Sequence, residues 1–120
     1  MPIGTTLVGD DDMISNGVSD LVMQTDGNLV FYVDDFYYPG SKYVCWASNT
    51  EGHPGARAVY QADGNFVVYS AANRALWSSG TNGRSASTVR IVENAGGYPR
   101  VYVGNTPYGP FNCPDGYPGP

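Results

Sequence analysis

Two short stretches of the sequence repeat the same polar and aromatic side chains at the same intervals. Residues 23–32 read MQTDGNLVFY and residues 60–69 read YQADGNFVVY. The shared positions are Gln24, Asp26, Asn28, Val30 and Tyr32 in the first copy and Gln61, Asp63, Asn65, Val67 and Tyr69 in the second. Carboxamides and a carboxylate offer donors and acceptors side by side for the adjacent hydroxyls of a hexose, and a valine methyl can contact its ring carbons. We therefore predict a sugar-binding site in each copy.

The arrangement of each copy depends on whether it forms a continuous strand. Side chains alternate along a strand, so all five shared side chains of a copy are predicted to lie on one face. In the alternative interpretation, Asp-Gly-Asn only marks a turn, because these residues are common turn formers. Turn formation does not require Gln, Val and Tyr at fixed positions in both copies, and this favours a binding face.

Each copy is followed by a tryptophan segment, WASNT at 46–50 and WSSGT at 77–81, so the chain is built from repeated units. Gln24 and Trp46 are 22 positions apart, whereas Gln61 and Trp77 are 16 apart. The first unit therefore carries six extra residues, which we place within residues 35–42.

A third unit is predicted from residues that favour strands at 87–92 and 100–103, although the polar motif is lost there. Counting from Trp77 by the same spacing places Val92 where the Gln should be and Asn94 where the Asp should be. Residues 95–99 then carry an insertion. We predict three units, of which two keep the motif.

The composition favours an all-β domain and excludes several classes of partner. The chain has 16 Gly, 9 Pro and 10 Tyr, which disfavour helices and favour strands and turns. A net charge of −5 with only six Lys and Arg gives no basic surface for nucleic acid or an anionic membrane. No apolar stretch approaches the roughly 20 residues of a membrane span, and no signal peptide is visible, so the compartment is not indicated: cytoplasmic, or secreted by a route not written in this chain.

Catalytic and metal sites are not indicated either. A glycosidase needs two carboxylates facing one sugar at about 5–10 Å, and Asp26 and Asp63 belong to different units. His53 is the only histidine and is expected in a surface loop. The acidic runs at 10–12 and 34–35 lack the ligand pattern of a calcium loop. We predict no catalytic residues, no metal and no cofactor.

Two further groups of residues leave alternatives open. Cys45 and Cys113 either form one disulfide, remain two buried thiols, or link the chain to another chain. The aromatic residues Phe36, Tyr37, Tyr38 and Tyr43 either form a protein-binding patch or extend the first sugar site toward a larger glycan.

The repeated Gln-x-Asp-x-Asn-x-Val-x-Tyr motif and the WASNT segment resemble the bulb-type mannose-binding lectins of monocots, over about residues 4–108. The resemblance implies a β-prism II fold, with three four-stranded antiparallel subdomains around a pseudo-threefold axis and tryptophans in the centre. Trp46 and Trp77 fill two of the three tryptophan places, and Phe111 or Tyr108 fills the third. The disulfide that family members often hold within the first unit has no matching cysteine pair here.

The resemblance also implies a role for each motif residue. The Asp and Asn of each copy bind the axial 2-hydroxyl of mannose, the Gln binds the 3-hydroxyl, the Tyr binds the 4-hydroxyl, and the Val contacts the ring. The chain is then a single lectin domain, residues 1–120, with a Pro- and Gly-rich tail at 109–120, two active mannose sites, an inactive third site, and a homodimer formed by exchanged C-terminal strands. Some domains of this kind are instead antibacterial or protein-interaction modules, which is the alternative function.

Overall fold

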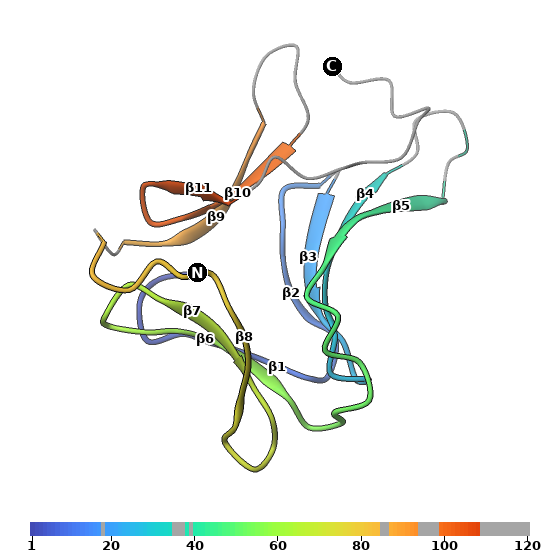
Figure 1. Cartoon of the computed structure of the whole chain (residues 1–120). Helices are drawn as coiled ribbons and strands as arrows, with labels where there is room; N and C mark the ends of the chain where they lie inside the picture. The colour runs from blue at the N-terminus through green and yellow to red at the C-terminus, as the bar shows by residue number, and fades with distance from the viewer. Residues whose placement is uncertain (18, 35–37, 39, 85–86, 94–98, 109–120) are drawn as a thin grey trace.

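The computed structural model describes the chain except for residues 18, 35–37, 39, 85–86, 94–98 and 109–120, and these described residues form three antiparallel sheets (Figure 1). One sheet contains β2 (Asp12–Ser15), β3 (Ser19–Met23), β4 (Leu29–Asp34) and β5 (Lys42–Ala47) in that order. The second contains β1 (Thr6–Val8), β6 (Arg57–Tyr60), β7 (Phe66–Tyr69) and β8 (Ala75–Ser78). The third contains β9 (Val89–Glu93), β10 (Pro99–Val103) and β11 (Thr106–Tyr108).

The N-terminal segment of the chain lies along one edge of every sheet. β2 pairs with β3, and β1 pairs with β6 in the sheet of the second unit. At the edge of β9 opposite β10, the start of the chain pairs only near one end, where Pro2 bridges Thr88 and the amide of Val89 donates to the Met1 carbonyl at 2.9 Å. The prediction of an all-β chain of three units is confirmed, but the third sheet has three described strands where four were expected.

The pairing register shows that the three units correspond without gaps. Asp20 pairs with Tyr32, Arg57 with Tyr69 and Arg90 with Tyr102, and in each pair the tyrosine lies twelve positions later.

The predicted insertion at 95–99 and the assignment of Val92 to the Gln position are therefore wrong. Val92 pairs with Arg100, as Val59 pairs with Val67, so it is Asn94 that corresponds in sequence to Gln61. The extra length lies instead between the units, since Trp46 precedes Arg57 by eleven positions and Trp77 precedes Arg90 by thirteen. Residues 94–98 themselves lie outside the described part of the chain.

The six extra residues of the first unit lie where the sequence predicts them. Tyr32 pairs with Val44, twelve positions later, whereas Tyr69 pairs with Ala75, only six positions later. The added length therefore falls in the connection between β4 and β5. Of the aromatic residues in this connection, Tyr38 is exposed, while Phe36 and Tyr37 lie outside the described residues.

The inward faces of the three sheets meet in one apolar core. Alternate residues of the strands point into it, because successive side chains of a strand lie on opposite faces. They include Met23, Leu29, Phe31, Val33, Ala58, Tyr60, Phe66, Val68, Val89, Val101 and Val103. Trp46 and Trp77 pack against this core with ring centroids 5.1 Å apart. The strand connections between the core residues carry the polar motifs.

The third unit places Tyr108 where the other units have tryptophan. Phe31 pairs with Trp46 and Val68 with Trp77, and at the corresponding register Val101 pairs with Tyr108. Phe111, the other candidate, lies outside the described residues. Cys45 is buried and disulfide-bonded, whereas Cys113 also lies outside the described residues.

Candidate functional site

The first half of each motif forms a hairpin turn, not a strand. β3 ends at Met23 and β4 begins at Leu29, and between them the Gln24 amide donates to the Asn28 carbonyl at 2.9 Å. The second copy repeats this bond between Gln61 and Asn65 at 2.9 Å. The predicted alternation along one strand is therefore wrong for residues 24–28 and 61–65. It holds only for the Val and Tyr of each copy, which lie on β4 and β7.

The Asp and Gly of the motif explain this turn. Asp26 Oδ1 accepts a hydrogen bond from the Asn28 amide at 2.9 Å, the local contact by which Asp competes with strand pairing. Gly27 has a φ of 91°, which favours glycine, and a Cβ there would lie 2.3 Å from the His53 carbonyl oxygen. Asp-Gly-Asn thus forms the turn of the alternative interpretation, and the same turn carries the polar groups of the motif.

The loop after each tryptophan makes backbone hydrogen bonds to the hairpin. The amides of Gly52 and His53 donate to the Asp26 carbonyl at 2.9 and 3.1 Å. In the second unit the Gly83 amide donates to the Asp63 carbonyl at 2.7 Å. Each hairpin is therefore fixed by backbone contacts that leave its carboxylate and amide side chains at the surface.

In each motif, hydrogen bonds to the carboxamide oxygen hold the asparagine side chain in place. Asn28 Oδ1 accepts from Ser48 Oγ at 3.2 Å and from the Thr50 amide at 3.3 Å. A backbone amide can only donate, so the atom that faces it is the oxygen and not the nitrogen. Asn65 Oδ1 likewise accepts from Ser79 Oγ at 3.2 Å and from the Thr81 amide at 3.3 Å. Within the described chain, Nδ2 of both asparagines has no partner.

The serine and threonine that hold this asparagine were not predicted. The hydroxyl oxygens of Ser48 and Thr50 lie 2.7 Å apart, and the buried Thr50 hydroxyl donates to the Gly27 carbonyl at 2.5 Å. Ser79 and Thr81 make the same contacts in the second unit. The signal was present in the sequence, because Ser and Thr stand two and four positions after both tryptophans.

The glutamine and tyrosine of each motif meet across the hairpin. The Gln24 carboxamide donates to the Tyr32 hydroxyl, and Gln61 makes the same contact with Tyr69. Val30 and Val67 lie beneath them and are each only 3% exposed, so they offer little surface to a ligand.

Among the residues that the structure describes, the two hairpins therefore carry the same set of groups without a hydrogen-bond partner. In each copy the Asp keeps one carboxylate oxygen, the Asn its Nδ2 donor, the Gln its carboxamide oxygen and the Tyr its hydroxyl hydrogen. Each set contains both acceptors and donors, which is the requirement for binding vicinal hydroxyls.

Charged neighbours distinguish the two hairpins. Beside Tyr32, Lys42 Nζ lies 2.9 Å from Asp20 and 2.6 Å from Asp34. Beside Tyr69, Arg57 occupies the place of Asp20, with its guanidinium carbon 5.2 Å from the ring centroid of the tyrosine. The first tyrosine is thus flanked by an ion-pair cluster and the second by a single cation.

The ion-pair cluster shifts the pKa values of its members. Burial raises the pKa of Asp20, but hydrogen bonds from Ser15 and Lys42 outweigh it, so the pKa lies below the ordinary 3.8. Hydrogen bonds to Asp34 and Asp20 raise the pKa of Lys42 above 10.5 against a smaller opposing effect of burial. Stability from Asp20 is lost as pH falls through its lowered pKa, and stability from Lys42 is lost as pH rises through its raised pKa.

We expect Lys42→Gln to destabilise the chain by about 0.5 kcal/mol at neutral pH, because the lysine is 44% exposed and solvent screens the pair. The difference from wild type should be constant between about pH 5 and 9 and should shrink below pH 3.8 and above pH 10.5. Urea unfolding at a series of pH values measures it. Arg84→Gln is the control, since Arg84 forms no ion pair within the described residues. A difference that does not change with pH would contradict the assignment to these charges.

The third unit keeps the tyrosine of the motif and loses the valine two positions before it. Tyr102 pairs with Arg90, whose guanidinium carbon lies 5.0 Å from the ring centroid. Arg100 stands at the position of Val30 and Val67. The residues that correspond to the hairpin, 94–98, lie outside the described part of the chain.

The remaining predictions concern metals, membranes and the histidine. His53 is exposed in the loop between the first two units, as expected. Among the described residues, no group of three or more His, Cys, Asp or Glu is placed to hold a metal ion. In the same part of the chain, no helix is both long and apolar enough to cross a membrane.

Comparisons with known proteins place this geometry in a family. No family model matches the chain. A mannose-specific lectin from Aloe arborescens is 43% identical over 81 residues, which span 62% of this chain and 66% of that protein. A lectin structure from Allium sativum is 32% identical, covers 88% of this chain and 93% of its own, and superposes with a TM-score of 0.64. The chain belongs to the monocot mannose-binding lectins.

Other members of the family share the fold of this lectin. The snowdrop (Galanthus nivalis) agglutinin, solved with methyl-α-D-mannoside, is 29% identical with a TM-score of 0.64, and the match covers 85% of this chain and 86% of that one. The β-prism II fold and the absence of an enzymatic role are thereby confirmed. Dimerisation stays a prediction, and family members from Gastrodia elata are described as monomeric.

Proposed function

We propose that this lectin binds mannose and mannose-containing glycans at two sites, formed by Gln24–Tyr32 and Gln61–Tyr69. The observation that carries the proposal is the identical hydrogen bonding of the two hairpins, down to the asparagine held by Ser and Thr. Two separate loops keep the same donors and acceptors exposed, although folding alone requires only the turn. The snowdrop and Polygonatum cyrtonema lectins, which share this fold, were solved with bound mannosides.

The exposed groups suit the hydroxyls of mannose. Asn Nδ2 donates and the second Asp oxygen accepts at the axial 2-hydroxyl, which distinguishes mannose from glucose. The Gln oxygen accepts from the 3-hydroxyl, and the Tyr hydroxyl bonds the 4-hydroxyl. The valine contributes only a small contact to the ring, because it is almost fully buried in both units.

The third unit does not bind mannose in this proposal. Of the motif, the sequence retains only Tyr102, with Asn94 in place of Gln, Gly96 in place of Asp and Tyr98 in place of Asn. Arg100 replaces the apolar valine with a charged side chain. We also propose a homodimer in which the C-terminal residues of a second copy complete the third sheet, since β9 is paired at its outer edge only near Thr88 in the described residues.

Isothermal titration with methyl-α-D-mannoside, with the α-glucoside as the comparison, tests the proposal. We expect about two equivalents of mannoside per chain and a response to glucoside at least about tenfold weaker, because glucose lacks the axial hydroxyl. About three equivalents would contradict the loss of the third site. Absence of heat with both mannoside and oligomannose would favour the antibacterial or protein-interaction role of the same scaffold.

A further inference from the structure

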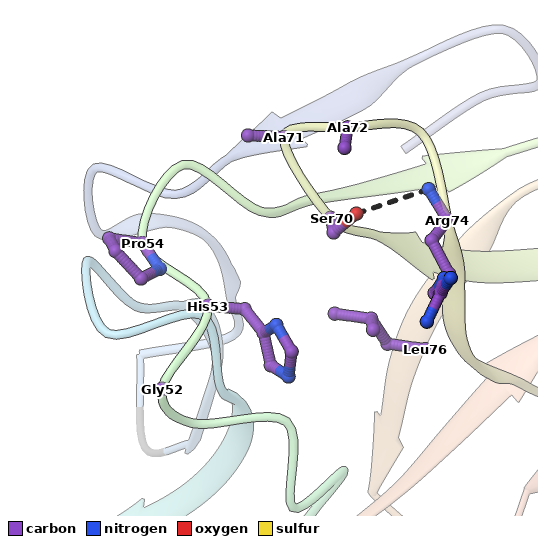
Figure 2. Close-up of a pocket in the computed structure, with 8 residues that line it drawn as sticks. All are labelled: Gly52, His53, Pro54, Ser70, Ala71, Ala72, Arg74 and Leu76. Atoms are coloured by element: carbon purple, nitrogen blue, oxygen red, sulfur yellow. Dashed lines mark hydrogen bonds between the residues drawn. The ribbon is translucent and has the colours of Figure 1, made fainter.

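A pocket of about 430 Å³ lies between the first and second units, and none of the motif residues lines it (Figure 2). One wall is the loop at residues 52–54, and the other is the turn between β7 and β8 together with Leu76. Figure 2 shows the His53 ring reaching from the first wall toward Leu76 and Arg74 on the second. The volume lies within the range of about 300–1,000 Å³ that small-molecule sites occupy.

Hydrogen bonds hold both walls in place. The amides of Gly52 and His53 donate to Asp26, and the Ala56 amide donates to the His53 carbonyl at 3.1 Å. On the second wall, the Ser70 amide donates to the Arg74 carbonyl at 2.8 Å, and the Arg74 amide donates to Ser70 Oγ at 3.1 Å.

A basic side chain from outside the pocket reinforces the second wall. Arg57 donates to the Ser70 carbonyl at 3.2 Å and to Asn73 Oδ1 at 2.6 Å. The backbone of both walls is therefore fixed before a ligand binds, which lowers the cost of ordering them.

The lining combines apolar side chains on both walls with donors that have no acceptor. Leu76, Pro54 and the methyl groups of Ala71 and Ala72 provide the apolar surface. Within the described residues, neither the guanidinium of Arg74 nor the imidazole of His53 has a hydrogen-bond or ion-pair partner. A guanidinium fork binds a carboxylate with two parallel hydrogen bonds, and the imidazole N–H adds a further donor.

We propose that this pocket binds the carboxylate of an acidic sugar, such as a hexuronate, with the sugar ring against Leu76 and Pro54. The net charge of −5 argues that such binding depends on specific contacts and not on general attraction of anions. The pocket shares no side chain with the two mannose motifs, so the proposal does not rest on the proposed function.

Amide chemical shifts of the ¹⁵N-labelled full chain, titrated with methyl β-D-glucuronide, test the proposal. We expect shifts at Gly52, His53, Ser70 and Arg74, and a response to the neutral methyl β-D-glucoside at least about tenfold weaker, because a charge-assisted hydrogen bond is lost. Absence of shifts at these amides, or equal responses to the two glycosides, would overturn the proposal.

Three variants localise the effect. Arg74→Gln should weaken glucuronide binding at least about tenfold and leave mannoside binding unchanged. Arg84→Gln removes the same charge from an exposed loop position outside the pocket and should bind like wild type. The Asn28→Asp, Asn65→Asp double variant should retain the glucuronide response. Unchanged glucuronide binding in Arg74→Gln would overturn the proposal even if the mannose sites prove inactive.

Discussion

The double variant Asn28→Asp, Asn65→Asp is expected to lose mannoside binding by at least about 100-fold while it remains folded. The substitution keeps Oδ1, which accepts from Ser48 and Thr50 in the first unit. It replaces the exposed Nδ2 donor with an acceptor, so that the axial hydroxyl of mannose faces two acceptors and one of its hydrogen bonds is lost. Alanine would be less informative, because it removes the structural oxygen together with the ligand donor.

Titration calorimetry of the single variants separates the two sites. Asn28→Asp alone should reduce the stoichiometry from about two to about one, and Asn65→Asp should do the same. Asn49→Asp is the matched control, since it introduces the same charge at an exposed neighbouring position and should keep both sites. The free energy of unfolding should change by less than about 1 kcal/mol in all three. Full affinity at two sites in Asn28→Asp would show that the asparagine does not contact the sugar.

The second large effect concerns the core that holds the hairpins. Phe66 is 1% exposed, and its ring lies edge-on to two other aromatic rings. The ring centroids are 6.0 Å apart for Trp77 and 6.4 Å apart for Tyr60. We expect Phe66→Ala to lower the free energy of unfolding by about 3–5 kcal/mol, because it removes buried area and leaves a cavity beside the tryptophan pair. For a domain of this size the total is about 5–15 kcal/mol, so the loss is large.

Denaturant unfolding followed by tryptophan fluorescence measures this loss. Phe66→Leu is the matched control, because Leu29 occupies the corresponding first position of β4 and is fully buried there. The leucine variant should lose less than half as much free energy as the alanine variant. Equal losses would mean that the aromatic contacts with Trp77 and Tyr60, and not the filled volume, determine stability at this position.

The repeated motif predicted the fold and the positions of the polar residues because it is a periodic signal. Equal spacing of the motif residues within the two copies indicated the units, and the unequal distances from Gln24 to Trp46 and from Gln61 to Trp77 located the extra residues of the β4–β5 connection. Side-chain alternation failed at residues 24–28 because the Asx contact of Asp26 and the positive φ of Gly27 turn the chain there. A turn can carry a binding motif as well as a strand can, and the sequence alone did not distinguish them.

The third unit was misaligned because spacing was counted across a linker. Linkers between units vary in length, whereas the strand pairing within a unit does not, and the β9–β10 pairs, such as Arg90 with Tyr102, give the correct register. The roles of Ser48 and Thr50 were missed for a different reason. These residues act on Asn28 from twenty or more positions away, and such long-range contacts are not visible in local patterns.

The first fifteen residues supply an edge strand to two of the sheets and bridge the third at Thr88, so a single segment ties the three units together. Repeats in open arrays contact only their neighbours and can be added or removed. Here one N-terminal segment contacts all three units, so the chain should unfold cooperatively. The two hairpins consequently keep one fixed separation and orientation. If the two mannose ends of a branched glycan match that separation, binding of one end brings the other to the second hairpin. The effective concentration of that second end is then set by the rigid protein and not by a flexible linker.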